Sequence, residues 1–317
     1  MENLRIAQNE WPIYKDLTIT ENIGELEYHI DLDGTTIYAG KAYKYPNADN
    51  VQFTINDACG GYLHSTYPES YGLEKDTNYM RNFVVNTSIG TQYSYNIYND
   101  WSYKLKNETS IINNPISNLV GYGQTIYCSI LVFETATLYV YVNDELYENA
   151  TLEGPGLYNY TIPAHYQCGS KIRFEVNNST LEYEVDRTKK YVLYYSNAAG
   201  GWDSLLIGGN VRKVDEIQSE IYMKKNPNPL EFDKTKYLNT IKPQWSLYTG
   251  YLSDDNSLKM FNLLESLQVY LYDLETKELV PVVITDNVCE YKTYTNNGKK
   301  KSNYIIKVEG SKNKYRQ

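Results

Sequence analysis

The sequence predicts a mainly β protein, in which tandem β-sandwich regions of immunoglobulin-like type precede a C-terminal α+β module. Short runs of residues alternate between apolar and polar, and pairs such as Asp33-Gly34 and Asn143-Asp144 interrupt them about every 8–12 residues. One stretch, after Ser253, has the apolar spacing of an amphipathic helix. The chain is expected to divide into three parts, residues 1–76, 77–188 and 189–317.

The first part, residues 1–76, is expected to be an N-terminal β-hairpin domain. Residues 26–32 alternate between apolar and polar, the pair Asp33-Gly34 follows, and residues 35–38 return with β-branched and aromatic side chains. Alternation on both sides of an Asp-Gly pair is the strongest short-range signal for a β-hairpin. Residues 51–55 continue the strand pattern. The polar segment 65–76 is predicted to be a linker because it carries turn-forming proline and glycine.

The second part, residues 77–188, is expected to be an immunoglobulin-like β-sandwich. Tyr93, Tyr95 and Ile97 open it, and residues 138–142 alternate before the Asn143-Asp144 turn. Two further breaks follow, at Gly154-Pro155-Gly156 and at Asn177-Asn178, and each separates apolar runs. Several short strands separated by regular turns are typical of such a sandwich.

The third part, residues 189–317, is expected to be an α+β module that serves in assembly. Strands are predicted at 191–195, 269–272 and 281–285, and Asn297-Gly298 is predicted to close a last hairpin. Ser253 is a good N-cap for the helix that follows it. The helix is expected to bury one face, made of four residues: Leu258, Phe261, Leu264 and Leu267.

Tyrosine dominates the aromatic composition. The chain has 317 residues, with 35 Tyr but only 6 Phe and 4 Trp. Tyrosine suits half-buried strands and protein–protein interfaces, because a large apolar ring carries a polar tip. An AT-rich genome would also raise the tyrosine content, and both explanations stay open. We expect tyrosine to be enriched in subunit contacts.

Charge and cysteine content exclude several classes of function. The formal net charge is −9, so the chain is a poor non-specific ligand for nucleic acid, whose phosphates attract lysine and arginine. The four cysteines are widely spaced and are expected to be unpaired thiols in a reducing cytoplasm: Cys59, Cys128, Cys168 and Cys289. We expect no signal peptide, since the first residues are acidic, and no membrane-spanning segment.

One motif invites a catalytic interpretation. Asp31-Leu32-Asp33-Gly34-Thr35 matches the nucleophile loop of haloacid-dehalogenase-type phosphatases, in which the first Asp attacks phosphorus and Mg²⁺ neutralises the carboxylates. Such a loop follows a buried parallel strand, which reads as a continuous apolar run. Here the preceding residues alternate with Glu27 and His29, so a hairpin end is favoured over a Mg-dependent phosphatase acting through Asp31 and Asp33.

The other polar candidates have simpler explanations. His64 follows Cys59 closely, but a buried thiol near an exposed imidazole is favoured over a catalytic pair. Asp254-Asp255 is explained by the positive end of the predicted helix. Gly200-Gly201-Trp202 is expected to be a tight turn with a packed tryptophan, because no lysine follows the glycines. The sequence therefore predicts no catalytic residue, no cofactor and no metal site, and no enzyme.

Several stretches together resemble a family of structural virion proteins from phages that infect Bacteroidota, including crAss-like phages. They are residues 37–43, 55–59, 62–63, 98–103, 200–204, 245–252 and 282–286. Among them are Tyr98-Asn99-Asp100-Trp101 and Gly200-Gly201-Trp202-Asp203-Ser204. The resemblance covers most of the chain, and none of these motifs is catalytic. It implies a tail, neck-ring or tail-hub component of the virion.

We therefore expect a non-enzymatic protein that works by protein–protein assembly. Its expected partners are copies of itself in a ring-like homo-oligomer and neighbouring tail or neck proteins, with no specific nucleic acid and no membrane. Its expected location is the virion, after synthesis in the host bacterial cytoplasm. A carbohydrate-binding or receptor-binding phage protein is the alternative, because tyrosine and tryptophan surfaces also bind sugars. A ring is a natural form for the assembly protein, because head-to-tail contacts between identical subunits close into a ring when the rotation between neighbours allows it.

Overall fold

The structure confirms a mainly β protein. It is a computed structural model that describes residues 10–12, 18–46, 48, 50–99, 108–186, 189–223, 234–285, 302–312 and 314–316. Nearly all regular structure in these ranges is strand, and the helices are short. No helix in the described part of the chain is long and apolar enough to cross a membrane. The predicted hairpin at Asn297-Gly298, the motif residues 100–103 and Cys289 lie outside the described residues.

An N-terminal sheet with the strand order β1-β8-β7-β3-β4 forms the first region. Its strands are β1 (Glu10–Pro12), β3 (Glu25–Leu32), β4 (Thr35–Tyr43), β7 (Met80–Thr87) and β8 (Gln92–Tyr98). A separate pair, β2 (Thr18–Glu21) with β5 (Val51–Thr54), precedes the single-turn helix α1 (Asn56–Gly60). Ile30, Phe83, Val85 and Ile97 are buried in the core between these elements because each belongs to the inward-facing set of its strand.

The Asp33-Gly34 turn joins β3 to β4 as the sequence predicts. Asp33 and Gly34 both have positive φ, 50° and 78°. This is the backbone that a two-residue turn of type I′ requires. Asp33 pairs with Arg81 of β7 at 2.8 Å, and Asp31 accepts hydrogen bonds from Thr36 (2.6 Å) and Asn86 (2.8 Å). These contacts hold the hairpin on the sheet.

The second region is a sandwich of two sheets with the orders β6-β14-β11-β9 and β10-β16-β15-β12-β13. Its strands are β6 (Gly72–Asp76), β9 (Ser110–Ile111), β10 (Leu119–Gly121), β11 (Thr125–Val132), β12 (Ala136–Val142), β13 (Glu145–Leu152), β14 (Gly156–Pro163), β15 (Lys171–Val176) and β16 (Ser179–Asp186). Immunoglobulin sandwiches carry strands A, B, E and D on one sheet and C, F and G on the other. Taken in chain order, β9, β11 and β14 occupy the A, B and E positions, and β12, β15 and β16 occupy C, F and G. The immunoglobulin-like character is therefore confirmed.

The strands do not keep to the expected boundary at residues 76 and 77. β6 was expected in a linker, but it pairs with β14 and fills the D position of the sandwich. β7 and β8, expected to open the sandwich with Tyr93, Tyr95 and Ile97, instead extend the N-terminal sheet through β3. The two regions thus exchange strands. Alternation indicates that a segment is a strand, but it carries no information on which sheet the strand joins.

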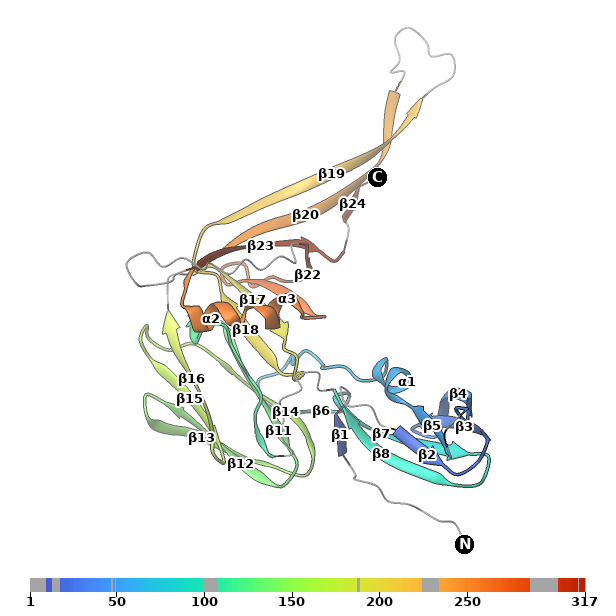
Figure 1. The fold of residues 1–317 in the computed structure, drawn as a ribbon. Helices are drawn as coiled ribbons and strands as arrows, with labels where there is room; N and C mark the ends of the chain where they lie inside the picture. The colour runs from blue at the N-terminus through green and yellow to red at the C-terminus, as the bar shows by residue number, and fades with distance from the viewer. Residues whose placement is uncertain are drawn as a thin grey trace.

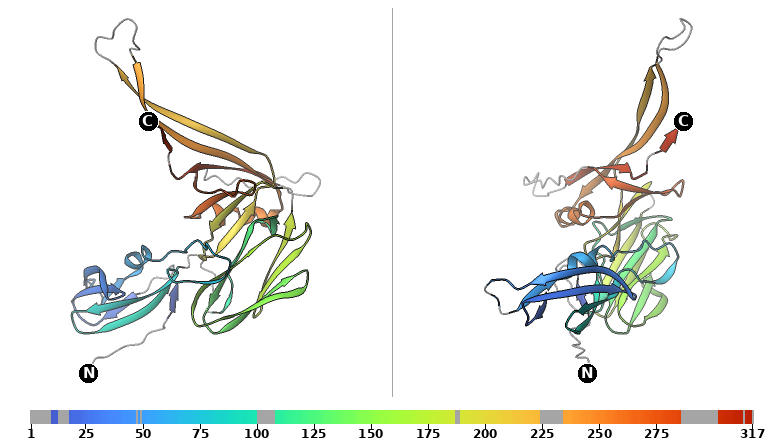
Figure 2. Two further views of the ribbon diagram at one scale, coloured as in Figure 1. Left: turned by 180° about the vertical axis from the view of Figure 1, so that it is seen from behind. Right: turned by 90° about the vertical axis from the view of Figure 1, so that its right-hand side faces the viewer.

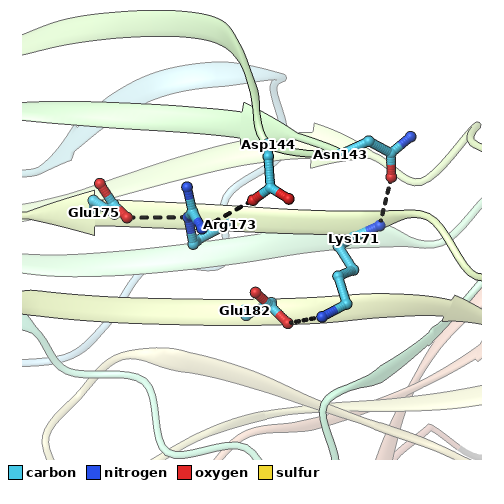
Figure 3. Close-up of polar contacts among 6 residues, drawn as sticks. All are labelled: Asn143, Asp144, Lys171, Arg173, Glu175 and Glu182. Atoms are coloured by element: carbon cyan, nitrogen blue, oxygen red, sulfur yellow. Dashed lines mark hydrogen bonds and ion pairs between the residues drawn. The ribbon is translucent and has the colours of Figure 1, made fainter.

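Charged residues cover the solvent face of the sandwich next to the predicted Asn143-Asp144 turn (Figure 3). Asn143 and Asp144 have positive φ, 50° and 66°, which confirms the turn. Arg173 lies between Asp144 and Glu175, 3.0 Å from each, and its guanidinium stacks on Tyr141 at 4.8 Å. Exposed pairs of this kind contribute about 0–1 kcal/mol each. We infer that these ion pairs hold the turn against the sheet.

The third region is built on a sheet with the order β18-β17-β21-β22-β23-β20-β19, to which β24 adds beside β20. Its strands are β17 (Tyr191–Ser196), β18 (Trp202–Leu206), β19 (Val211–Met223), β20 (Lys234–Leu252), β21 (Val269–Asp273), β22 (Leu279–Ile284), β23 (Ser302–Gly310) and β24 (Lys314–Arg316). Two single-turn helices, α2 (Asp254–Leu258) and α3 (Met260–Leu264), connect β20 to β21. Met260 and Leu263 of α3 pack with Leu193, Leu247 and Leu271 of the sheet.

The predicted helix begins where expected, but its buried face was wrong. The Ser253 side chain accepts a hydrogen bond from the Asn256 amide, as an N-cap should. The helix then breaks at Lys259, and Leu258, Phe261 and Leu267 are 62%, 45% and 92% exposed. Residues three apart rotate by about 60° less than a full turn, so after three such steps they lie on opposite sides of a helix. The chosen set could not share one face.

Figures 1 and 2 show how the regions are arranged. The N-terminal sheet and the sandwich lie next to each other at one end of the molecule, below the C-terminal sheet in Figure 1. β19 and β20 leave that sheet and project as a long ribbon from the opposite end, as all three views show. The short strand β24 pairs with β20 along part of it, at Asn239–Ile241.

Candidate interaction surfaces

A buried junction around Trp202 joins the three regions. The Trp202 ring is 0% exposed, and its indole N–H donates to the Thr66 carbonyl at 2.9 Å. The Tyr79 hydroxyl donates to the Ala199 carbonyl at 2.8 Å. Gly200 has φ +83°, and a Cβ there would collide with the Tyr79 ring. The predicted tight turn with a packed tryptophan is confirmed, and its glycine allows the N-terminal region to approach.

A carboxylate lies fully buried in this junction. Asp203 accepts hydrogen bonds from the side chains of Asn113 (3.0 Å) and Asn197 (2.8 Å) and from the Asn114 amide (3.0 Å). Burial raises the pKa of Asp203 to about 6, and these donors oppose the rise because they stabilise the charged form. With every oxygen occupied by neighbouring groups, Asp203 organises the junction and has no room for a substrate. The sequence indicated the motif that contains Asp203, but it did not predict that this side chain is buried.

An aromatic pocket, the tyrosine pocket, opens beside the junction with a volume of about 400 Å³. Its lining comes from the segment before β6, from β11 of the sandwich and from β21 and β22 of the C-terminal sheet, and it includes Tyr67, Glu69, Tyr71, Thr125, Tyr127 and Tyr270. The Tyr67 ring contacts Tyr270 at 4.8 Å and Trp202 at 5.1 Å between centroids, so its back is packed against the junction. Pockets between structural units, with aromatic walls and a few polar groups, are typical ligand sites.

A second aromatic surface lies on the N-terminal sheet. Tyr28 and Phe53 stack at 4.0 Å between centroids at the base of an open trough of about 610 Å³. Tyr43 and Tyr45 line the same trough and are 61% and 69% exposed. Unlike the tyrosine pocket, the trough is formed by the N-terminal region alone.

The two faces of the β19–β20 ribbon both mix apolar and polar residues, and the isoleucines of β19 lie on one of them. The register opposes Ile217 to Ile241 and Lys213 to Trp245 on one face, and Gln218 to Thr240 and Glu216 to Lys242 on the other. Trp245 and Leu247 are buried in the core, so the face with the isoleucines continues the core-facing side of the sheet into solvent.

Along β19 this face carries an apolar stripe that no described residue covers. Ile217, Ile221 and Met223 follow in steps of two or four, and they are 60%, 55% and 64% exposed. β19 is also the last strand in the described order of its sheet. The sequence patterns did not predict this surface. Val214, Ile217 and Ile221 have the spacing of a helix, which hides the strand alternation.

The sequence-flagged polar residues do not come together as a catalytic site. Asp31 and Asp33 end an antiparallel hairpin, where the phosphatase loop would follow a parallel strand. Cys59 is buried in the N-terminal core, where burial raises its thiol pKa to about 12, while the His64 side chain is exposed. Within the described residues, no group of three or more His, Cys, Asp and Glu side chains could hold a metal ion.

The thiol prediction is confirmed for the described cysteines. Cys59, Cys128 and Cys168 are free, the first two of them buried. Tyrosine contributes to both the core and the surface of the described chain. Ten described tyrosines are buried and ten are exposed, so tyrosine supplies the core as much as the surface. Many buried hydroxyls have partners, as a buried tyrosine requires, including Tyr194 with the Thr125 carbonyl at 3.1 Å.

Comparisons with known proteins give only distant similarities. No protein-family model and no curated protein matches the chain. Among solved structures, SGBP-B of the Bacteroides ovatus mixed-linkage glucan utilization locus, in complex with a mixed-linkage heptasaccharide, is 11% identical, with a TM-score of 0.20. That match covers 80% of this chain and 64% of SGBP-B, so the chain spans less than two thirds of that protein.

Two further structures are similar at the same level. The I9–I11 tandem of titin is 7% identical over 77% of this chain and 93% of its own, with a TM-score of 0.17. Dimeric latent PorU from Porphyromonas gingivalis is 10% identical over 94% of this chain and 28% of its own, with a TM-score of 0.22. TM-scores in this range do not establish a shared fold, so the function has to be argued from the residues of this chain.

Proposed function

We propose that this chain is a non-enzymatic structural protein that assembles with copies of itself and with neighbouring proteins, as a tail, neck-ring or tail-hub component of a bacteriophage virion. The apolar stripe on the β19–β20 ribbon is the observation that supports assembly. The virion setting is supported by the sequence resemblance alone.

The ribbon is costly to leave uncovered. Ile217, Ile221 and Met223 together expose apolar area that water disfavours by about 25 cal/mol per Å². Their strand is an edge of its sheet in the described part of the chain, and edge strands offer unpaired backbone groups to another chain. A protein that functions alone has no use for such an arm, whereas a subunit that clasps its neighbour buries it.

The opposite face of the ribbon gives the matched control. Ile217→Lys with Ile221→Lys places two positive charges on the apolar stripe. Gln218→Lys with Thr240→Lys places the same two charges on the opposite face, because these two residues oppose each other in the register. Both pairs lie on the projecting ribbon, so neither should change the folded core.

Mass measurement in solution, followed by electron microscopy, tests the proposal. We expect the unmodified chain to form a defined oligomer, the stripe variant to fall to monomers, and the opposite-face variant to assemble normally. Equal assembly of all three proteins would contradict a role for the stripe. Peptides of this chain should also be found in purified phage particles, and their absence there would reject the virion setting.

A further inference from the structure

The tyrosine pocket between the sandwich and the C-terminal sheet is not used by the proposed assembly. Its walls come from the segment before β6, from β11 and from β21 and β22. The ribbon leaves the molecule at the other side of the C-terminal sheet (Figure 1). A ligand in the pocket would therefore be bound independently of the ribbon.

The aromatic walls are held in place before any ligand arrives. The Tyr67 ring is fixed by Tyr270, Trp202 and Tyr127, at centroid distances of 4.8, 5.1 and 5.6 Å. Tyr71 stands at the rim and is 65% exposed. Packed rings lose little further freedom on binding, which favours affinity. The pocket therefore combines packed tyrosine rings with the exposed ring of Tyr71.

The polar groups of the pocket include both donors and acceptors. The Tyr127 hydroxyl donates to the Tyr67 oxygen at 2.6 Å, so the Tyr67 hydroxyl keeps its own hydrogen for another acceptor. Glu69 supplies carboxylate oxygens, which only accept when ionised. No basic side chain is among the described lining residues. A ligand that carries several hydroxyl groups and no negative charge would satisfy this set.

We propose that the tyrosine pocket is a binding site for a neutral oligosaccharide. The C–H face of a pyranose packs on an aromatic ring, and its hydroxyls both donate and accept, so it matches Tyr67, Tyr71 and Glu69 together. A phosphate or a uronic acid would be repelled by Glu69, with no cation to offset it. A proline-rich segment stacks on tyrosine but offers mainly carbonyl acceptors, which leaves the Glu69 oxygens without donors.

Calorimetric titration with defined probes tests this site. The probes are cellohexaose, maltohexaose, xylohexaose and mannohexaose, followed by an array of neutral glycans, with an oligogalacturonate and a polyproline peptide for comparison. Tyr71→Ala removes the exposed rim ring without emptying the core. Tyr67→Phe removes only the hydroxyl. Tyr45→Ala is the matched control, since Tyr45 is an equally exposed tyrosine, 69%, in the separate N-terminal trough.

We expect at least one neutral glycan to bind, with affinity reduced about tenfold or more by Tyr71→Ala and by Tyr67→Phe and unchanged by Tyr45→Ala, which corresponds to a loss of about 1.4 kcal/mol or more. Melting temperatures check that each variant is folded. Binding to no neutral glycan overturns the proposal. So does tighter binding of the polyproline peptide or the oligogalacturonate, or a loss of glycan binding in Tyr45→Ala with none in Tyr71→Ala.

Discussion

The junction around Trp202 and the β19–β20 ribbon belong to the same C-terminal sheet, yet they differ in almost every physical respect. At the junction, side chains from three regions bury an indole and a carboxylate completely. Along the ribbon, the strand that carries Trp245 into the core runs on into solvent, and its partner strand exposes Ile217 and Ile221. One sheet thus has a fully buried part at the junction and a solvent-exposed part along the ribbon.

The comparison predicts that stability depends on the junction and hardly at all on the ribbon. Trp202→Ala should have the largest effect, because it leaves a large cavity and removes the hydrogen bond to Thr66. We expect a loss of about 3–5 kcal/mol in the free energy of unfolding, measured by chemical denaturation. Tyr251→Ala is the control, since Tyr251 is 76% exposed, and it should stay within about 0.5 kcal/mol. A small loss for Trp202→Ala would mean that the regions fold independently.

The corrected helix face gives the next prediction. Leu263 is 0% exposed and packs in the C-terminal core, whereas Leu267 is 92% exposed. Leu263→Ala should cost about 2–4 kcal/mol, and Leu267→Ala about 0.5 kcal/mol or less. The two melting temperatures, compared in the same buffer, check this difference. Equal effects would show that residues 258–267 pack differently from the structure.

Asp203 tests the polar half of the junction. Asp203→Asn keeps the shape of the side chain but turns an amide N–H₂ toward donors from Asn113, Asn114 and Asn197. Leaving buried donors unsatisfied costs about 1–3 kcal/mol. Urea denaturation at neutral pH measures the loss. An unchanged midpoint would mean that water satisfies these donors instead.

Asp203 also predicts a pH dependence with a defined sign. Its pKa is raised to about 6 in the folded protein, so the native state binds a proton that the unfolded state releases. Its contribution to stability therefore grows as the pH falls through about 6. When the pH is lowered from about 7.5 to about 5.5, we expect the free energy of unfolding to rise by about 1 kcal/mol.

The gain should be smaller in Asp203→Asn, while Asp76, whose carboxyl pKa burial also raises, remains in both proteins. Thermal unfolding of both proteins at several pH values separates the contribution of Asp203 from that of Asp76. The same pH dependence in both proteins would place the titrating group elsewhere.

The ribbon should show the smallest effect on stability. Ile217→Lys with Ile221→Lys removes apolar side chains that are already 60% and 55% exposed. Under conditions where the chain is monomeric, the shift in melting temperature should correspond to a change of about 0.5 kcal/mol or less in the free energy of unfolding. A larger loss would show that the stripe is covered within the subunit, and the contrast between junction and ribbon would fail.

Much of the local structure could be predicted because it depends on neighbouring residues. The turns at Asp33-Gly34 and Asn143-Asp144 need residues that tolerate positive φ, and the sequence supplies them there. Ser253 caps its helix through a bond to a residue three positions away. The free state of the described thiols also followed from their spacing.

The partition of strands among sheets and the candidate sites could not be predicted in this way. β6 joins β14 across more than 80 residues of sequence, and nothing in its polar residues identifies that partner. The tyrosine pocket gathers Tyr67, Tyr127 and Tyr270 from three separate segments, and each of them alone resembles any other tyrosine of the chain. The apolar stripe was not predicted, because the spacing of Val214, Ile217 and Ile221 is typical of a helix and obscures the alternation of the strand.

The sequence by itself determined the β class, the positions of the tight turns and the helix start, because φ preferences, alternation and capping act over a few residues. Only the tertiary structure decided which tyrosines are buried, which sheet each strand joins, and that Asp203 is a buried structural carboxylate. Burial and pairing are set by residues far apart in the chain, and a strand pattern marks an inward face without saying what will cover it. On the ribbon that pattern continues beyond the core, where no residue in the described part of the chain covers it.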